Sequence, residues 1–286
     1  MQKQAEQLPG EAQCTAEYER HLRQEERSAN TVAKYMRDIG AFFVFLCGRE
    51  INKEEVLAWK GTLGRYAPSS VNSMLAAVNG YLSWTGRGAY RAKPVKMQRA
   101  IFAKPERELT KEEYGRLVKA AEAKRHRRLS LVMQTVCATG IRVSELRHIT
   151  AEAVKQGRCT VTCKGKSRVV FLPWELCGVL KKYCREQRIE GGVVFRTKSG
   201  AALDRSNIWR EMKALCQAAR VSPQKVFPHN LRHLFARTYY RLEKDLSRLA
   251  DLLGHASVTT TRIYTMESGK QHARQLGRMG LVLAQT

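Results

Sequence analysis

The sequence predicts a mainly α-helical protein with a small β-hairpin, arranged as an N-terminal helical bundle followed by a mixed α/β domain. Three observations support this fold class. The chain has 286 residues, which is long enough for two ordinary domains. Apolar side chains recur at helical spacing in many segments, most clearly over residues 31–47. Residues 158–163 (RCTVTC) and 168–172 (RVVFL) are typical of two strands around a short turn.

The N-terminal part is predicted to be a bundle over residues 14–86, after a polar, disordered stretch over residues 1–13. The expected helices cover residues 15–26, 31–47 and 52–63, with a fourth starting at residue 68. Residues that favour helix starts precede or open three of them: Ser28 or Asn30, Asn52 and Pro68.

A basic linker is expected over residues 87–106, because this stretch is rich in Lys and Arg, holds two prolines and lacks periodicity. Two interpretations stay open for it. The segment either follows a phosphate backbone around a duplex or is a solvated hinge.

The second domain is expected over residues 107–286. Thr110 and Glu113 have the spacing of a capping box, which opens a helix over residues 111–123. Gly140 ends the next helix, and a new helix opens near Arg142. The remaining expected elements are the hairpin, a helix over 174–187, a short strand over 193–195, a helix from Asp204 to about 219, and helices over 245–253, 258–264 and 268–283.

The charge of the chain indicates a polyanionic partner. Lys and Arg number 51 against 26 Asp and Glu, which gives a net charge of +25. Nucleic acid is the commonest partner of so basic a protein, although charge alone leaves DNA against RNA open. The sequence has no apolar run of membrane-spanning length and no signal-peptide core. We therefore expect a cytoplasmic protein with no membrane partner.

Cysteine and histidine spacing does not predict a metal centre. The chain has eight cysteines, but none forms a C-x-x-C pair and no paired histidines complete a zinc set. Reduced, mostly buried thiols are expected, which agrees with a cytoplasmic location. We expect neither a metal nor a cofactor.

Residues 228–265 hold four side chains that can bind or attack a phosphate: His229, Arg232, His255 and Tyr264. Arg232 follows His229 by three positions, so both share one helix face. Upstream, Arg142 stands at the opening turn of a helix, where backbone N–H groups attract anions.

The order and spacing of these motifs resemble the tyrosine recombinases, also called the phage integrase family. The matching pattern is Arg142, then His229-x-x-Arg232-His233, then Leu-Leu-Gly-His255, then Tyr264 nine positions later. The strings ATGIRVSEL, HNLRHLFA and LLGHASVTTTRIYT look most like the Xer-type bacterial members. The resemblance covers residues 107–286 and, more loosely, the N-terminal half.

The resemblance implies a role for each matching residue. Arg142 and Arg232 would hold the scissile phosphate, and Tyr264 would attack it to give a 3′-phosphotyrosine and a free 5′-hydroxyl. His229 would support the tyrosine, and His255 would bind a nonbridging oxygen.

Roles are also expected for three further side chains. Lys164, in the hairpin turn, would protonate the leaving 5′ oxygen, with Lys166 as the alternative. Glu145 would support the arginines or the hairpin, unless it is a plain helix-surface glutamate. His233 directly follows Arg232, so we expect it to face elsewhere on the helix and to be structural.

At the level of the whole protein, the resemblance implies a site-specific recombinase that acts on double-stranded DNA through a Holliday junction, as a homo-tetramer or a hetero-tetramer with a paralogue. The bundle would be the SAM-like core-binding domain, and the last helix would dock in trans. With so few residues before the first helix, a Xer-type, resolvase-type or inversion-type enzyme or a short mobile-element integrase is expected. The alternatives are a type IB topoisomerase-like enzyme and a non-catalytic DNA-binding relative.

Overall fold

A computed structural model describes residues 9–97, 105–163, 166–197, 199–255, 257–264 and 269–279. The chain divides into two compact units, Met1–Arg99 and Ala100–Thr286, and each is described here by itself. Among the described helices, none is long and apolar enough to cross a membrane.

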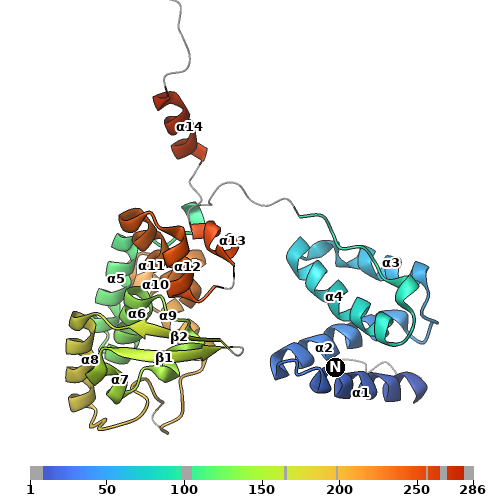
Figure 1. Ribbon diagram of the computed structural model, residues 1–286, viewed down its shortest axis with the longest axis horizontal. Helices are drawn as coiled ribbons and strands as arrows, with labels where there is room; N and C mark the ends of the chain where they lie inside the picture. The colour runs from blue at the N-terminus through green and yellow to red at the C-terminus, as the bar shows by residue number, and fades with distance from the viewer. Residues whose placement is uncertain are drawn as a thin grey trace, which may run out of the picture. The chain divides into compact units, whose positions relative to one another are not determined.

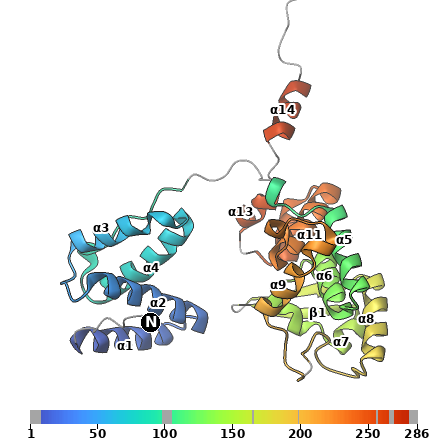
Figure 2. The same ribbon diagram turned by 180° about the vertical axis from the view of Figure 1, so that it is seen from behind.

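The N-terminal unit is a helical bundle in which α2 lies between α1 and α4 (Figure 1 and Figure 2). Its helices are α1 (Pro9–Gln24), α2 (Ala29–Leu46), α3 (Lys53–Thr62) and α4 (Pro68–Trp84). The side chains of Ser28 and Asn52 accept hydrogen bonds from first-turn N–H groups, as caps do. Helix α1 begins at Pro9, six residues before its expected start, because proline suits the first turn of a helix.

Part of the expected linker packs against this bundle. Residues Gly88–Tyr90 form a 3₁₀ turn (η2), and two asparagines of α4 bind the extended chain that follows. Asn79 donates to the carbonyl of Ala92 (2.8 Å) and accepts from its N–H (3.0 Å). Asn72 makes the same pair of bonds to Val95 (2.9 and 2.7 Å). Since an amide side chain offers the donor and acceptor of a peptide group, the two asparagines act like a neighbouring strand.

The described part of the second unit contains one two-stranded antiparallel sheet and many helices (Figure 1). Strand β1 (Arg158–Cys163) pairs with β2 (Lys166–Phe171), from Arg158 opposite Phe171 to Cys163 opposite Lys166. The α-helices are α5 (Lys111–Ala123), α6 (Arg127–Thr139), α7 (Ala151–Gln156), α8 (Trp174–Glu186), α9 (Arg205–Lys213), α10 (Cys216–Ala219), α11 (Pro228–Glu243), α12 (Leu246–Leu253), α13 (Val258–Thr261) and α14 (Gly269–Arg278). The 3₁₀ turns used below are η4 (Val143–His148) and η6 (Arg262–Tyr264).

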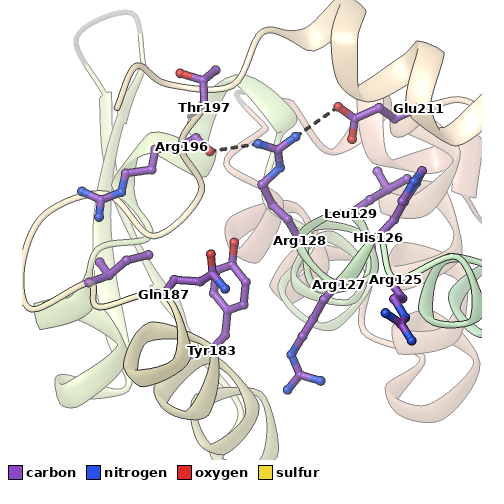
Figure 3. Close-up of a pocket in the computed structure, with 11 residues that line it drawn as sticks. Arg125, His126, Arg127, Arg128, Leu129, Tyr183, Gln187, Arg196, Thr197 and Glu211 are labelled. Atoms are coloured by element: carbon purple, nitrogen blue, oxygen red, sulfur yellow. Dashed lines mark hydrogen bonds and ion pairs between the residues drawn. The ribbon is translucent and has the colours of Figure 1, made fainter. Parts of the chain in front are cut away.

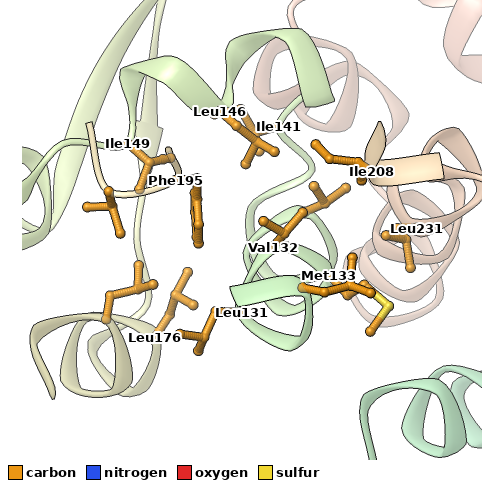
Figure 4. Packing of buried hydrophobic residues seen from close by; sticks show 14 of the residues in the cluster. Leu131, Val132, Met133, Ile141, Leu146, Ile149, Leu176, Phe195, Ile208 and Leu231 are labelled. Atoms are coloured by element: carbon orange, nitrogen blue, oxygen red, sulfur yellow. The ribbon is translucent and has the colours of Figure 1, made fainter. Parts of the chain in front are cut away.

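Helix α6 forms the centre of the core of this unit and contacts α5, α8, α9 and α11. Three consecutive α6 residues, Leu131, Val132 and Met133, are at most 3 % exposed. Figure 4 shows this cluster between Ile208 and Leu231 on one side and apolar residues such as Leu176 and Phe195 on the other. Because α6 ends at Gly140, this packing fixes the position of the turn that carries Arg142.

Several elements of the second unit differ from the sequence-based expectation. The strand expected over 193–195 is a single bridge between Thr150 and Val193. The helix from Asp204 divides into α9 and α10. Between them the N–H of Leu215 donates to the carbonyl of Met212, three residues back, so the α-helical hydrogen-bond pattern is interrupted by a 3₁₀-type bond. The helix expected after Arg142 is the 3₁₀ turn η4. The overall fold class is nevertheless confirmed.

Candidate active site

Helix α11 provides Arg232, which is 1 % exposed and is the most buried cation among the described residues of this unit. Its Nη1 donates to the carbonyl of Gly140 (2.5 Å) and its Nη2 to the carbonyl of Leu253 (2.6 Å). Among the described residues its Nε has no hydrogen-bond partner. Burial, followed by the charge of Arg142, lowers the pKa of Arg232 to about 10. The guanidinium is thus rigidly placed and its charge is poorly compensated, which favours an anion beside it.

Arg142 and Glu145 are held together at the start of η4. Arg142 Nη1 donates to Glu145 Oε1 and the Arg142 backbone N–H to Glu145 Oε2, both over 2.9 Å. The Glu145 side chain is 4 % exposed, so it is a buried carboxylate and not a surface glutamate. Burial would raise the pKa of Glu145, but hydrogen bonds from Arg168 and Arg142 outweigh it and lower the pKa to about 2.

Arg168 of β2 is a member of this cluster that the motif analysis missed. It grips Glu145 with two hydrogen bonds, Nη1 to Oε1 (3.1 Å) and Nη2 to Oε2 (2.8 Å). Its Nε donates to the carbonyl of Leu252 (3.2 Å). Strand alternation contained the signal, since Arg168 faces the same side as buried Val170 while Val169 is exposed.

His255 lies between Arg232 and Thr261. Its Nε2 is 3.1 Å from Arg232 Nη2, and its Nδ1 is 2.8 Å from Thr261 Oγ1. Burial, together with the charges of Arg232 and Arg142, lowers the pKa of His255 to about 4. His255 is therefore neutral at physiological pH in the free protein.

Tyr264 is 4 % exposed at the end of η6 and packs between two histidines. Its ring meets that of His233 edge-on at 4.7 Å and stacks on that of His255 at 6.0 Å. The expectation that His233 faces elsewhere is wrong. His233 follows His229 by four positions, so these two rings share one helix face and lie 4.6 Å apart.

A cavity of about 150 Å³ opens beside these residues, lined in part by Arg142, His229 and Arg232. Arg205, at the start of α9, also lines it, and no sequence signal marked this residue. Burial, then the charges of Arg232, Arg205 and Arg142, lower the pKa of His229. Three guanidinium groups around one small cavity make it a site for an anion.

Other expected features are less defined. Lys164 lies outside the described residues, so the choice between it and Lys166 stays a prediction. In the described part of the chain, no group of three or more His, Cys, Asp or Glu side chains could hold a metal ion. Of the eight cysteines, the seven whose side chains the structure describes have free thiols.

A larger cavity, of about 650 Å³, lies near the N-terminal end of α6 (Figure 3). Four arginines line it, but Arg128 bonds to Glu211 (3.2 Å) and to the carbonyl of Arg196 (3.1 Å). It shares no lining residue with the smaller cavity and contains none of the expected site residues. The volume of a cavity alone therefore does not identify the candidate active site.

Comparison with known proteins decides the family. The model of the phage integrase family matches residues 107–271, and that of the phage integrase N-terminal SAM-like domain matches residues 15–87. The chain belongs to the phage integrase family. Its resemblance to tyrosine recombinases is thereby confirmed, and the protein is an enzyme of the tyrosine recombinase class.

Relatives of this integrase-family protein match it over most of their length. The tyrosine recombinase XerC of Roseiflexus castenholzii is 32 % identical over 86 % of this chain and 86 % of its own. The tyrosine recombinase XerA of Thermococcus kodakarensis is 29 % identical over 87 % and 89 %. A crystal structure of a lambda integrase (75–356) dimer bound to a COC′ core site has the same fold, with a TM-score of 0.71, 20 % identity, and coverage of 91 % of this chain and 96 % of that one.

Proposed function

We propose that this integrase-family protein is a site-specific recombinase that cuts and rejoins duplex DNA through a 3′-phosphotyrosine at Tyr264. One observation carries the proposal. The ring of Tyr264 stacks on His255, and His255 bonds directly to Arg232. A nucleophile and a buried cation with poorly compensated charge thus belong to one cluster, next to a cavity that Arg142 also lines.

The arginines would provide electrostatic stabilisation. A phosphodiester repels nucleophiles, and its two nonbridging oxygens gain charge as the tyrosine attacks. Each guanidinium can donate two hydrogen bonds in one plane, which suits a pair of phosphate oxygens. Because Arg232 is fixed by two carbonyls and Arg142 by Glu145, they need little reorganisation when the phosphate enters.

The tyrosine would provide covalent catalysis. A phenol with an ordinary pKa of about 10 attacks well only when nearby positive charge favours the phenolate. Attack by Tyr264 Oη forms the phosphotyrosine ester and breaks the bond to the 5′ oxygen, which leaves with a proton from Lys164 or Lys166. The ester keeps the bond energy for rejoining, so neither ATP nor a metal is needed.

The histidines would have separate roles. His229, whose side chain is solvent-accessible beside the arginine-lined cavity, can take the phenol proton because its lowered pKa keeps it neutral at pH 7. His255 would bind a nonbridging oxygen, for which it must exchange its contact with Arg232 for one with the phosphate. His233 packs against the rings of His229 and Tyr264 and orients the Tyr264 ring.

We infer that four subunits hold two DNA sites and exchange strands through a Holliday junction, either as a homo-tetramer or with a paralogue. The net charge of +25 supports extensive contact with phosphates. The N-terminal bundle would clasp one side of the duplex, and α14 would dock on the next subunit. Free thiols and a DNA substrate both suit a cytoplasmic location.

Strand exchange distinguishes this function from the alternatives. Bound fragments of the host genome would first be selected with the Tyr264→Phe protein, which gives the target sequence. Two labelled duplexes carrying that sequence would then be incubated with the wild-type protein. We expect recombinant strands and trapped four-way junctions.

Two other results would contradict the proposal. Relaxation of supercoiled plasmid without any exchange would indicate a topoisomerase-like enzyme. Binding without cleavage of a nicked suicide duplex would indicate a non-catalytic DNA-binding protein.

A further inference from the structure

Arg168 contacts two segments that carry expected catalytic groups. On one side it holds Glu145, which in turn holds Arg142 through its side chain and its backbone N–H. On the other side it donates to the carbonyl of Leu252, near the end of α12. Arg168 itself does not line the arginine-rich cavity, so it would act through other residues.

The contact with the end of α12 is close. Gly254, the residue before His255, has a φ of +63°, and a Cβ added there would lie 2.7 Å from Arg168 Cδ. A side chain at position 254 would therefore collide with Arg168. Leu253, between the two contact points, offers its carbonyl to Arg232. The same short turn thus connects Arg168 to Arg232 and His255.

Burial makes this arrangement rigid. The Arg168 and Glu145 side chains are 12 % and 4 % exposed, and their paired bonds fix the guanidinium plane. β2 begins at Lys166, two positions after Lys164 in the sequence. A residue that only neutralised Glu145 would need to contact that carboxylate alone. Arg168 instead donates through all three of its guanidinium nitrogens to two different segments, at Glu145 and at Leu252.

We propose that Arg168 is a positioning residue that locks the hairpin, the Arg142 turn and the Gly254–His255 turn into one frame around the scissile phosphate. This inference rests on the proposed recombinase function. Lysine keeps the charge but cannot make two parallel bonds to Glu145 and a third bond to Leu252. Arg168→Lys should therefore keep the fold and DNA binding while it misplaces Arg142 and His255.

The test compares two linkages at the cleavage site of a suicide duplex carrying the selected sequence. One is the ordinary phosphodiester, and the other is a methylphosphonate, which lacks the negative charge. Because the methylphosphonate carries no negative charge, its cleavage depends less on precisely placed cations. For Arg168→Lys we expect covalent attachment to slow at least about tenfold on the phosphodiester and by much less on the methylphosphonate. Arg158→Lys, at an exposed position on β1, is the matched control and should leave both rates unchanged.

Each outcome is informative. Equal slowing on both linkages, or no slowing, would overturn the role of Arg168 while the recombinase function stands. No covalent product from the wild-type protein would overturn both. Thermal unfolding and DNA affinity are measured for every variant. If Arg168→Lys does not fold, Arg168→Gln takes its place. The ratio of the attachment rates on the two linkages can still be compared with the wild type, because it does not depend on the fraction of active protein.

Discussion

His255 Nε2 lies 3.1 Å from Arg232 Nη2, and this contact fixes the tautomer of the histidine. A guanidinium nitrogen can only donate, so Nε2 must be the acceptor. The proton then resides on Nδ1, which donates to Thr261 Oγ1 over 2.8 Å. Before His255 can donate to a phosphate oxygen through Nε2, it must gain a proton or change tautomer.

The first prediction concerns the titration of His255. Its pKa is lowered to about 4 from an ordinary 6.5. Between these pH values the folded protein binds fewer protons than the unfolded chain. The contribution of His255 to the free energy of unfolding is therefore complete above pH 6.5 and is lost as the pH falls toward 4. Histidine ¹⁵N NMR should show the Nδ1–H tautomer at pH 7 and a midpoint near 4. A midpoint near 6.5, or the Nε2–H tautomer, would contradict it.

The second prediction concerns Glu145→Gln. The change removes a buried carboxylate that compensates two arginines, so it should lower the free energy of unfolding by about 3 kcal/mol at pH 7. The lowered pKa of Glu145 means that its contribution is complete above pH 4.5 and is lost as the pH falls toward 2. Urea unfolding from pH 7 to pH 2.5 should therefore show a smaller loss of stability in the variant. Glu175→Gln, at an exposed site on α8, is the control.

The third prediction compares two glycines that both end helices in the left-handed region. A Cβ at Gly254 (φ +63°) meets Arg168 at 2.7 Å, whereas one at Gly157 (φ +72°) meets nothing closer than 4.0 Å. Gly157→Ala should cost about 1 kcal/mol from backbone strain alone. Gly254→Ala should cost more in chemical denaturation and should also slow covalent attachment. Equal losses of stability in the two variants would contradict this prediction, because they would show that the Arg168 side chain moves away from position 254 at little cost.

Much of the fold could be predicted because local signals and packing agree. The capping box at Thr110 and Glu113 is confirmed, as are the hairpin and the N-cap at Asp204. The motif spacing also indicated Arg142, Arg232, His255 and Tyr264, which the structure brings together.

The misses have physical causes that differ from one residue to the next. Arg168 contacts Glu145 across 23 positions, and Arg205 reaches the cavity from another helix, so only tertiary packing relates them to the site. His233 faces Tyr264 because it lies four positions after His229 on α11, so the two histidines share one helix face. The expected strand at 193–195 pairs through Val193 with Thr150, and this pairing does not extend because Thr150 is the N-cap of α7.

The fourth prediction concerns Arg205→Gln. The positive charge of Arg205 helps to lower the pKa of His229, so its removal should raise that pKa toward 6.5 in NMR titrations. If Arg205 also contacts a DNA phosphate, the slope of log K against log salt concentration should fall by about 1. Arg210→Gln, on the same helix but outside the cavity lining, is the control. An unchanged pKa and salt slope would remove Arg205 from the site.

The most direct test of the account is to locate the covalent bond. The wild-type protein would be trapped on the suicide duplex, digested with nuclease and protease, and sequenced by mass spectrometry. Tyr264→Phe and Tyr240→Phe, which changes a neighbour in the same apolar cluster, would be treated in parallel. We expect a nucleotide phosphate on the Tyr264 peptide in the wild-type and Tyr240→Phe proteins, and no adduct in Tyr264→Phe. An adduct on any other residue, or one that persists in Tyr264→Phe, would contradict the assignment of Tyr264 as the nucleophile.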